Sequence, residues 1–293
     1  MSAPHVPRVD AHIHLWDPEL LSYPWLDALP SLQRKFALGD FPGLAADAAH
    51  AVDAVIAVEA NVAGGIGIAE ANLLDLYARE EPRLVGIVAY VNVPEVSPCI
   101  RALEQLRRSH RVVGVRHNIQ GHPPGYATHR NFVAGVKLVG EKDFPFDLCI
   151  TAAQLAEVTT LVQRCPSVCF ILDHCGKPNI AGGGFEEWRR GIDALAAHPS
   201  VYCKLSGLFT EAGPGRCNVE SLRPYLKHVI ETFGPRRVMY ASDWPVCTLA
   251  GSADDWHALV NDVVGGLCSR HERDEIFGGT AIRAYRLSIP APA

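Results

Sequence analysis

Apolar residues recur along this chain in short runs that end on polar residues. The runs are rich in Val and Ile, and their length and closing residues are typical of buried β-strands. The first run leads into His12 and His14, and the later runs repeat the pattern. Together they predict eight strands, the first ending at these histidines and the others at residues 52–59, 84–91, 112–119, 146–150, 168–174, 201–207 and 237–243.

The segments between the runs are long enough to cross back over a sheet, and they are rich in Ala, Leu, Glu and Arg, which favour helices. Strands that are almost wholly apolar and alternate with helices indicate a parallel sheet that helices cover. The predicted helices lie at residues 68–80, 96–109, 131–141, 152–165, 185–197 and 219–233, with two more after the last strand at about 252–267 and 271–285.

Consecutive strand and helix units, eight in number, predict an α/β fold, the (β/α)8 TIM barrel. A doubly wound open sheet is the alternative, but that fold does not need eight such units. We expect one domain over residues 1–293, because no linker or internal repeat interrupts the pattern. Residues 17–43 are too long for a simple turn and are expected to form a loop over the barrel mouth, and residues 271–285 to form a C-terminal helix.

The composition disfavours several classes of function. The chain has 27 basic and 32 acidic residues, a net charge of −5, and no dense cluster of Lys and Arg, so we expect no nucleic-acid partner. It lacks a signal-peptide pattern and any apolar run of the roughly 18 residues that cross a membrane, so we expect a soluble, cytoplasmic protein. Its nine cysteines are an odd number without Cys-x-x-Cys pairs, which indicates reduced thiols that pack in the core. The sequence is compatible with both a monomer and a homo-oligomer.

Ionisable residues gather at the carboxyl ends of the predicted strands, which form the active face of such a barrel. His12 and His14 are one residue apart, so they point to the same side of their strand and together can hold a metal ion or a substrate oxygen. A ring of such residues around one mouth indicates a catalytic site. The other polar residues at these ends are Glu59, Arg116, His117, Asp173, His174, Lys204, Ser206 and Asp243.

Most of these residues also have a structural interpretation. Asp173 and Asp243 could cap a following helix or turn, and His174 could hydrogen-bond a backbone carbonyl in the core. Arg116 could form an ion pair with Asp173 or with the carboxylate that ends the second strand, and Lys204 could pair with Asp243.

Several separated motifs, in a fixed order, mark these strand ends. They are His12-Ile13-His14, Leu172-Asp173-His174-Cys175-Gly176-Lys177-Pro178, Cys203-Lys204-Leu205-Ser206-Gly207 and Ser242-Asp243-Trp244-Pro245, with Tyr23-Pro24-Trp25 and Val115-Arg116-His117 beside them. Together they resemble the amidohydrolase superfamily and, within it, the sugar-lactonase branch that includes L-fuconolactonase and L-rhamnonolactonase. The resemblance covers about residues 8–285. It implies a barrel hydrolase in which His12, His14, His174 and Asp243 are the central polar residues.

The chain departs from the fuller metal-dependent pattern of that superfamily. Relatives commonly add a metal-bridging lysine on strand four and a histidine on strand five. Here strand four offers Arg116 and His117, and strand five ends in Leu148-Cys149-Ile150. A binuclear centre is therefore not expected. The resemblance implies one divalent ion, with zinc preferred, held by the four central residues, and a metal-free mechanism is the alternative.

Lactone hydrolysis needs an activated water, a polarised carbonyl and a proton for the departing ring oxygen. Asp243 is the expected general base, and His174 is expected to polarise the carbonyl, through a bound metal or by a hydrogen bond. The expected partner is a small-molecule sugar lactone. We expect polar and aromatic residues near the strand ends to bind it, namely Arg116, His117, Lys204, Glu59, Trp25 and Trp244.

Two other functions stay open. A decarboxylase of the same superfamily would need a bound metal and basic groups for carboxylates, which Arg116 and Lys204 could supply. A non-catalytic sugar-acid binding protein would bind the ligand without turnover. A dinucleotide enzyme is disfavoured, because Gly64-Gly65-Ile66-Gly67 lacks the third glycine of the fingerprint. The choice of lactone is expected to lie in the loops at 121–126 and 181–184.

Overall fold

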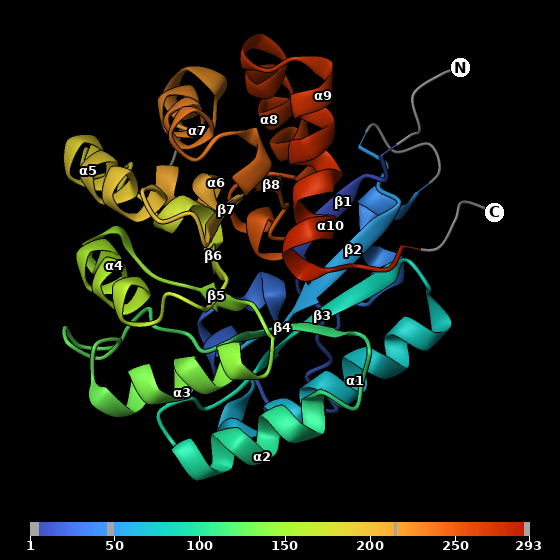
Figure 1. Cartoon of the computed structure of the whole chain (residues 1–293). Helices are drawn as coiled ribbons and strands as arrows, with labels where there is room; N and C mark the ends of the chain where they lie inside the picture. The colour runs from blue at the N-terminus through green and yellow to red at the C-terminus, as the bar shows by residue number, and fades with distance from the viewer. Residues whose placement is uncertain (1–5, 46–49, 214–215, 290–293) are drawn as a thin grey trace.

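The computed structural model describes residues 6–45, 50–213 and 216–289. Its strands form one eight-stranded sheet in which each consecutive pair is parallel and the spatial order follows the chain. This arrangement confirms the predicted (β/α)8 TIM barrel (Figure 1). The strands are β1 (Val9–Ile13), β2 (Ala54–Val58), β3 (Leu84–Tyr90), β4 (Val112–Arg116), β5 (Phe146–Leu148), β6 (Phe170–Leu172), β7 (Val201–Leu205) and β8 (Val238–Tyr240).

The barrel closes where β1 meets the segment that follows β8. Ile13 bridges Trp244 in parallel orientation. The amide of Asp243 donates a hydrogen bond to the carbonyl of His12 at 2.9 Å, and the amide of His14 donates to the carbonyl of Trp244 at 2.7 Å. The first and last strands are therefore joined at their carboxyl ends, where the predicted site residues lie.

Helices surround the sheet and face it with their apolar sides. The predicted helices between the strands are confirmed to within a few residues, apart from 152–165, which begins as a 3-10 turn. A short helix, α6 (Leu208–Ala212), was not predicted, because five residues are too few to show a helical period. The other surrounding helices are α1 (Gly67–Glu80), α2 (Val96–Leu106), α3 (Arg130–Glu141), α4 (Leu155–Arg164), α5 (Phe185–Ala196), α7 (Val219–Phe233) and α8 (Ala253–Leu267).

The predicted strands that run to residues 174, 207 and 243 extend too far. The observed strands end at Leu172, Leu205 and Tyr240. The reason is a change of backbone conformation beyond those ends, where His174 and Asp243 have φ angles of 55° and 61°. Such angles lie outside the β region, so the chain leaves the ladder just where its side chains must face the barrel mouth.

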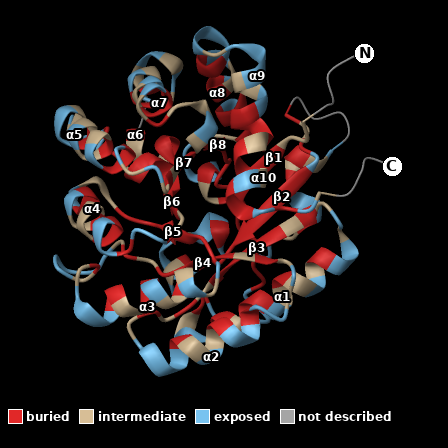
Figure 2. Ribbon diagram, viewed as in Figure 1, coloured by how far each residue is buried: buried red, intermediate tan, exposed pale blue. Residues whose placement is uncertain are grey.

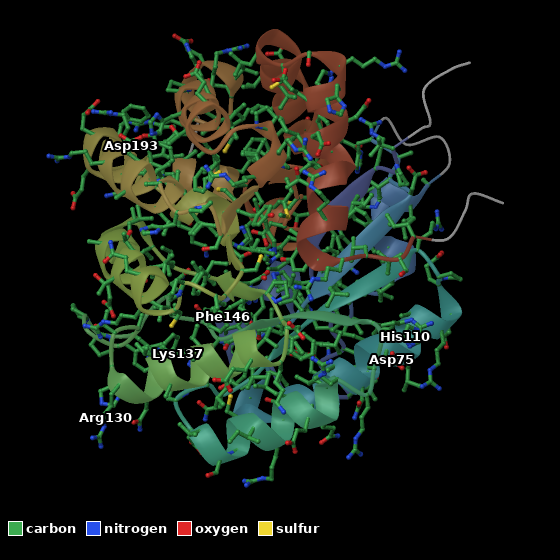
Figure 3. All side chains as sticks on the ribbon, viewed as in Figure 1. Asp75, His110, Arg130, Lys137, Phe146 and Asp193 are labelled. Carbon is green, nitrogen blue, oxygen red and sulfur yellow. The ribbon has the colours of Figure 1, made fainter. Side chains whose placement is uncertain are left out.

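The core has one layer inside the barrel and a larger one between the strands and the helices. Buried residues fill the strands, and the helices are buried on the side that faces them (Figure 2). Figure 3 shows the contrast on one side of the molecule, where Arg130 and Lys137 of α3 project outward while Phe146 of β5 is fully buried. All nine cysteines fall within the described ranges and are free thiols, as predicted. No helix of those ranges is both long and apolar enough to cross a membrane.

The predicted helix at 271–285 consists of three consecutive helical segments, α9 (Arg270–Asp274), a π-helical turn (Glu275–Gly279) and α10 (Thr280–Tyr285). Ala281, Ala284 and Tyr285 pack against interior residues of the barrel, among them Val9 and Met239. Helix α10 lies across the strands in Figure 1, on the side where they begin. This helix therefore covers the amino-terminal end of the barrel, opposite the predicted site.

The long segment after β1 forms several short 3-10 helices. Its Phe36 pairs with Trp16, and the rings of Phe36 and Phe41 pack on Trp244 at centroid distances of 5.5 Å and 5.4 Å. Trp25 donates a hydrogen bond to the carbonyl of Ala60 at 2.7 Å. The segment thus contacts residues that follow β8 and β2. The 3-10 helices are η1 (Pro24–Ala28), η2 (Pro30–Leu32), η3 (Leu38–Asp40) and η4 (Pro42–Leu44).

The packing of the π-helical turn against the start of the chain generates a prediction. A Cβ atom at Gly278 would lie 1.8 Å from the carbonyl oxygen of Pro7, whereas a Cβ at Gly265 of α8 would meet nothing within 4 Å. We expect Gly278→Ala to lower the free energy of unfolding by about 1–3 kcal/mol, through overpacking. Gly265→Ala should raise it by roughly 0.5–1 kcal/mol, because alanine favours a helix interior. Denaturant unfolding measures both, and equal effects of the two substitutions would contradict this description of the contact.

Candidate active site

Two imidazole nitrogens and one carboxylate oxygen face one point at the mouth of the barrel. The Nε2 atoms of His12 and His14 are 3.0 Å apart. Oδ1 of Asp243 lies 3.7 Å from the first and 3.5 Å from the second. All three residues are buried. We refer to His12, His14 and Asp243 as the triad.

The triad has a geometry that suits a divalent metal ion such as zinc. A tetrahedral ion with bonds of about 2.0–2.1 Å has ligand atoms about 3.3 Å apart. The three separations in the triad, 3.0 Å, 3.5 Å and 3.7 Å, scatter around that value. Two nitrogens and one oxygen are also a donor set that zinc accepts. The residues present therefore fit a single divalent ion.

An irregularity in β1 turns His12 inward. Val9 and Ala11 already face the barrel interior, so strict alternation would send His12 outward. The register of β1 against β2 shifts between Asp10 and Ile13. Oδ1 of the buried Asp10 accepts hydrogen bonds from the amides of His12, at 3.1 Å, and of Ser242, at 2.9 Å. Asp10 thus ties the irregular part of β1 to the segment after β8.

The second nitrogen of each triad histidine also has partners. Nδ1 of His14 lies 2.9 Å from the carbonyl of Val58, which can only accept, so this nitrogen carries the proton and Nε2 presents a lone pair. Nδ1 of His12 lies 3.2 Å from Oδ1 of Asp173 and 3.1 Å from Nζ of Lys204. Such outer partners orient the imidazoles toward a shared ion.

His174 lies on the other side of Asp243. Its Nδ1 is 2.9 Å from the hydroxyl of Ser206 and 3.9 Å from Oδ2 of Asp243. The sets of possible ligand atoms in the described residues place His174 with His12 and Asp173, and not with His14 and Asp243. The structure therefore brings all four predicted central residues together, with His174 in a second possible ligand set that shares His12 with the triad.

The turn that carries His174 is left-handed. Four consecutive residues, His174 to Lys177, have φ angles between 45° and 71°. For residues other than glycine this conformation costs roughly 1–2 kcal/mol each, and such strain is typical of functional sites. Trp188 of α5 supports the turn by donating to the carbonyl of Cys175 at 2.7 Å. A Cβ at Gly207 would lie 2.7 Å from the Cβ of His174, so only glycine fits at that position.

Burial and neighbouring charges determine the ionisation of the site. Burial lowers the pKa of His12 well below its usual value, and the charge of Lys204 lowers it further. Burial also lowers the pKa of His174, to about 4. Burial by itself would raise the pKa of Asp243, but the facing imidazoles of His174, His14 and His12 outweigh it and hold that pKa well below the usual range. Neutral imidazoles and an ionised carboxylate are the forms that bind metal.

A buried ion-pair network surrounds Asp173. Arg116 donates to Asp173 at 3.2 Å, to the Glu59 carboxylate at 2.5 Å and to the Glu59 carbonyl at 2.6 Å. Lys204 lies 2.9 Å from Asp173 and 2.6 Å from Asp147. The structural interpretation of Arg116 as an ion-pair partner is thus confirmed. The interpretation of Lys204 as a partner of Asp243 is wrong, because the lysine points below the triad to Asp147 and Asp173.

The remaining predicted substrate residues lie around this network. His117 points away from the triad, with Nε2 at 2.7 Å from the Tyr126 hydroxyl and Nδ1 at 3.1 Å from the carbonyl of Val91. Trp244 is buried beneath Phe36 and Phe41, as described above. Trp25 is half-buried and anchored to Ala60. Of these two tryptophans, Trp25 is the more exposed.

Sequence reasoning missed Asp147 and Tyr285. Asp147 is fully buried on β5, and the hydroxyl of Tyr285 donates to its Oδ2 at 2.7 Å. Burial raises the pKa of Asp147 to about 6, although the charge of Lys204 opposes the rise. A charged residue within an otherwise apolar predicted strand was the available signal for Asp147. No signal pointed to Tyr285, which reaches the network from the far end of the chain.

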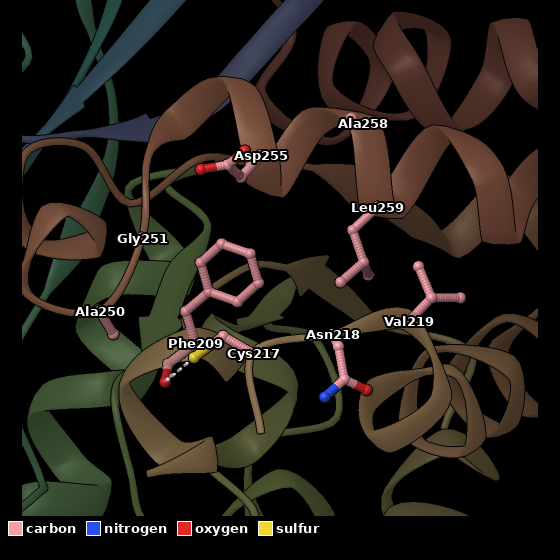
Figure 4. Close-up of a pocket in the computed structure, with 9 residues that line it drawn as sticks. All are labelled: Phe209, Cys217, Asn218, Val219, Ala250, Gly251, Asp255, Ala258 and Leu259. Carbon is pink, nitrogen blue, oxygen red and sulfur yellow. Dashed lines mark hydrogen bonds between the residues drawn. The ribbon is translucent and has the colours of Figure 1, made fainter. Parts of the chain in front are cut away.

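A separate hollow of about 450 Å³ lies between the segments that follow β7 and β8. Phe209, Val219 and Leu259 make much of its lining apolar (Figure 4). Its Asp255 carboxylate accepts a hydrogen bond from the Ser252 hydroxyl at 2.6 Å, and its Cys217 thiol donates to the carbonyl of Phe209. Both of these groups are thus engaged in local hydrogen bonds.

Comparison with known proteins identifies the family. The model of the amidohydrolase family matches residues 9–287. An L-fucono-1,5-lactonase of Burkholderia multivorans is 33% identical over 299 residues, covering 98% of each chain. An L-rhamnono-gamma-lactonase of Scheffersomyces stipitis is 27% identical over 217 residues, covering 66% of this chain and 65% of the other. The crystal structure of an amidohydrolase from Burkholderia multivorans with bound zinc has a TM-score of 0.87 and 32% identity, and covers 96% of this chain and 100% of that chain.

The triad geometry predicts the effect of removing one ligand. We expect His14→Gln to weaken zinc binding by about 100-fold or more, because loss of a ligand should exceed the roughly 10- to 100-fold cost of losing an outer partner. Competition with a chromogenic chelator measures the affinity. His110→Gln, on the exposed surface after α2, is the matched control and should bind zinc like the parent protein. Unchanged zinc affinity in the His14 variant would show that the ion does not bind at the triad.

Proposed function

The chain belongs to the amidohydrolase family, and we propose that it opens the ring of a sugar-acid lactone with a water molecule activated by Asp243. The observation that carries the proposal is the position of this carboxylate, with Oδ1 facing the Nε2 atoms of His12 and His14 and Oδ2 facing His174 at 3.9 Å. The similarity to an L-fucono-1,5-lactonase over 98% of the chain supports a sugar lactone as substrate. L-Fucono- and L-rhamnonolactone are therefore the first candidates.

Zinc is the ion that we propose for the triad. The donor set and its spacing support it, and so does the zinc in the similar amidohydrolase structure. A divalent ion bound there would polarise the lactone carbonyl as a Lewis acid and lower the pKa of a bound water. Burial lowers the pKa of His12 and the facing histidines lower that of Asp243, so these two ligands stay in the forms that bind metal, a neutral imidazole and an ionised carboxylate.

We assign different roles to the two carboxylate oxygens of Asp243. Oδ1 faces the two triad imidazoles, so Oδ2 is the oxygen that takes a proton from the attacking water. The water oxygen then bonds to the lactone carbon, and the bond from that carbon to the ring oxygen breaks. Asp243 returns the proton to the departing ring oxygen, and the product is the open hydroxy acid. His174, beside Oδ2, is placed to hydrogen-bond the carbonyl oxygen as negative charge develops on it.

Two hydrogen-bonded pairs after β4 and β6 are our candidates for contacts with the sugar hydroxyls. His117 pairs with Tyr126, and Lys177 donates to Gln120 at 2.7 Å. Tyr126, Gln120 and Lys177 are partly exposed, unlike Lys204, which is fully buried. We also propose that the segment at 17–43 closes over the mouth, with the half-buried Trp25 as its stacking residue.

A decarboxylase acting on an aromatic or muconate-type acid is the less favoured alternative. Such a substrate needs cations for its carboxylates. Arg116 is already paired with Glu59 and Asp173, and Lys204 with Asp147 and Asp173. Both cations thus neutralise buried carboxylates of the protein, which favours a substrate that carries hydroxyls and not carboxylates.

The nine free thiols support a reducing compartment, and we propose the cytoplasm.

Asp243→Asn tests the role of the carboxylate. We expect kcat to fall by about 10²- to 10⁴-fold, because the amide cannot accept the proton from water. Lactone hydrolysis with a pH indicator measures turnover, and calorimetry with the open-chain product acid measures binding. Asp193→Asn, on the surface of α5, is the control and should retain full activity. A variant at Asp243 that keeps full turnover would refute the mechanism, and a parent protein that binds the acid without any turnover would be a binding protein.

Metal removal separates the remaining alternatives. A panel of aldonolactones is assayed with the metal-free enzyme and with the enzyme reloaded with zinc. We expect hydrolysis of at least one aldonolactone, and a fall in kcat of about 100-fold or more on metal removal that zinc reverses. Equal rates in both forms would establish the metal-free mechanism. Release of carbon dioxide from an aromatic acid, with no lactone consumed, would favour the decarboxylase.

A further inference from the structure

Lys204 lies beneath the triad with an acceptor for each of its ammonium protons. Its Nζ is 2.6 Å from Oδ2 of Asp147, 2.9 Å from Oδ1 of Asp173 and 3.1 Å from Nδ1 of His12. An ammonium group has three donors and no lone pair. Nδ1 of His12 can therefore accept a hydrogen bond from Lys204, in the tautomer that leaves Nδ1 unprotonated. A neutral imidazole that accepts at Nδ1 carries its proton on Nε2.

This tautomer of His12 completes a chain of hydrogen bonds. Its Nε2 proton can be donated to Nε2 of His14, 3.0 Å away. His14 presents a lone pair there, because its Nδ1 donates to the carbonyl of Val58 at 2.9 Å. Donation thus runs from Lys204 through both histidines to Val58, with every donor satisfied. The arrangement is self-consistent without an ion between the two Nε2 atoms.

A metal ion at the triad needs the opposite tautomer. Nε2 of His12 must then present its lone pair, so the imidazole proton must sit on Nδ1. Oδ1 of Asp173, 3.2 Å from Nδ1, is the acceptor for that proton. Lys204 as a donor and Asp173 as an acceptor therefore compete for one nitrogen atom. The proton lost from Nε2 is matched by the one gained at Nδ1, so the exchange of tautomers releases no net proton from His12.

We propose that Lys204 is a positioning residue that favours the metal-free tautomer of His12, and that Asp147 limits its influence. Together they tune the affinity of the triad for its ion. The proposal rests on the metal site of the proposed function, and it assigns Lys204 a role other than the substrate contact expected from the sequence. Tyr285 of α10 donates to the Asp147 oxygen that also accepts from Lys204, so the C-terminal helix anchors this pair from the closed end of the barrel.

The first test reads the tautomer directly. Nitrogen-15 NMR of histidine-labelled, metal-free protein distinguishes a protonated from an unprotonated imidazole nitrogen. We expect His12 to carry its proton on Nε2 in the metal-free protein and on Nδ1 after zinc is added. A proton on Nδ1 in the metal-free parent protein would overturn the proposal, whatever happens to the variants.

The second test uses two substitutions that should act in opposite directions. Lys204→Met removes the competing donor and a positive charge, so His12 should adopt the Nδ1 tautomer without metal and zinc affinity should rise by about tenfold. Asp147→Asn removes the carboxylate that neutralises Lys204, so zinc affinity should fall by about tenfold. A merely structural role would lower the affinity in both variants. That outcome would overturn the proposal, and so would a parent protein that does not bind zinc.

Controls separate folding and lactone chemistry from these effects. Tyr240→Phe alters a buried tyrosine on the outer face of β8, away from the network, and should leave both the tautomer and the zinc affinity unchanged. Circular dichroism reports whether each variant folds, and the tautomer of the parent protein tests the proposal even where a variant does not. No lactone is used in these measurements, so absence of lactonase activity would refute the proposed function alone.

Discussion

The backbone hydrogen bonds that join β1 to the segment after β8 are the constraint on which the site depends. They run from the Asp243 amide to the His12 carbonyl and from the His14 amide to the Trp244 carbonyl. Because these peptide groups are paired at 2.9 Å and 2.7 Å, the side chains that they carry must converge at the mouth. Asp10 adds a second tie by accepting the amides of His12 and Ser242. The same hydrogen bonds therefore close the barrel and bring the triad together.

The charges beneath the triad are buried and paired. Burying a charge is costly unless it is paired and hydrogen-bonded, and the buried charges of this network satisfy one another. Asp173 is the common partner, since it faces His12, Arg116 and Lys204. Its pKa stays well below the usual range because Lys204, His12 and Arg116 outweigh the effect of burial. An ionised carboxylate therefore lies directly beneath His12, 3.2 Å from its Nδ1.

The same network links the two ends of the barrel. Residues at the carboxyl ends of the strands face the mouth, while α10 covers the amino-terminal ends. Tyr285 donates a hydrogen bond to Asp147, which accepts one from Lys204, and Lys204 in turn contacts His12. The last helix therefore contributes to the environment of the first strand. Backbone strain in the turn at His174 adds to the organisation of the mouth, and Trp188 and Gly207 accommodate it from outside the turn.

The sequence by itself determined the order of strands and helices, the barrel, and the polar residues at the strand ends. These follow from local periodicity, which each segment displays without its neighbours. It also placed a ring of polar residues at one mouth, because parallel strands in a barrel bring their carboxyl ends to one face. The resemblance to the amidohydrolase superfamily, and not the geometry, singled out His12, His14, His174 and Asp243 within that ring. Only the tertiary structure decided the pairing of Lys204 with Asp147, the contact of Tyr285 with that pair, and the position of His174 beside Ser206. The physical reason is that ion-pair partners and side-chain directions depend on register, on an irregular strand and on left-handed turns, which bring together residues far apart in the chain.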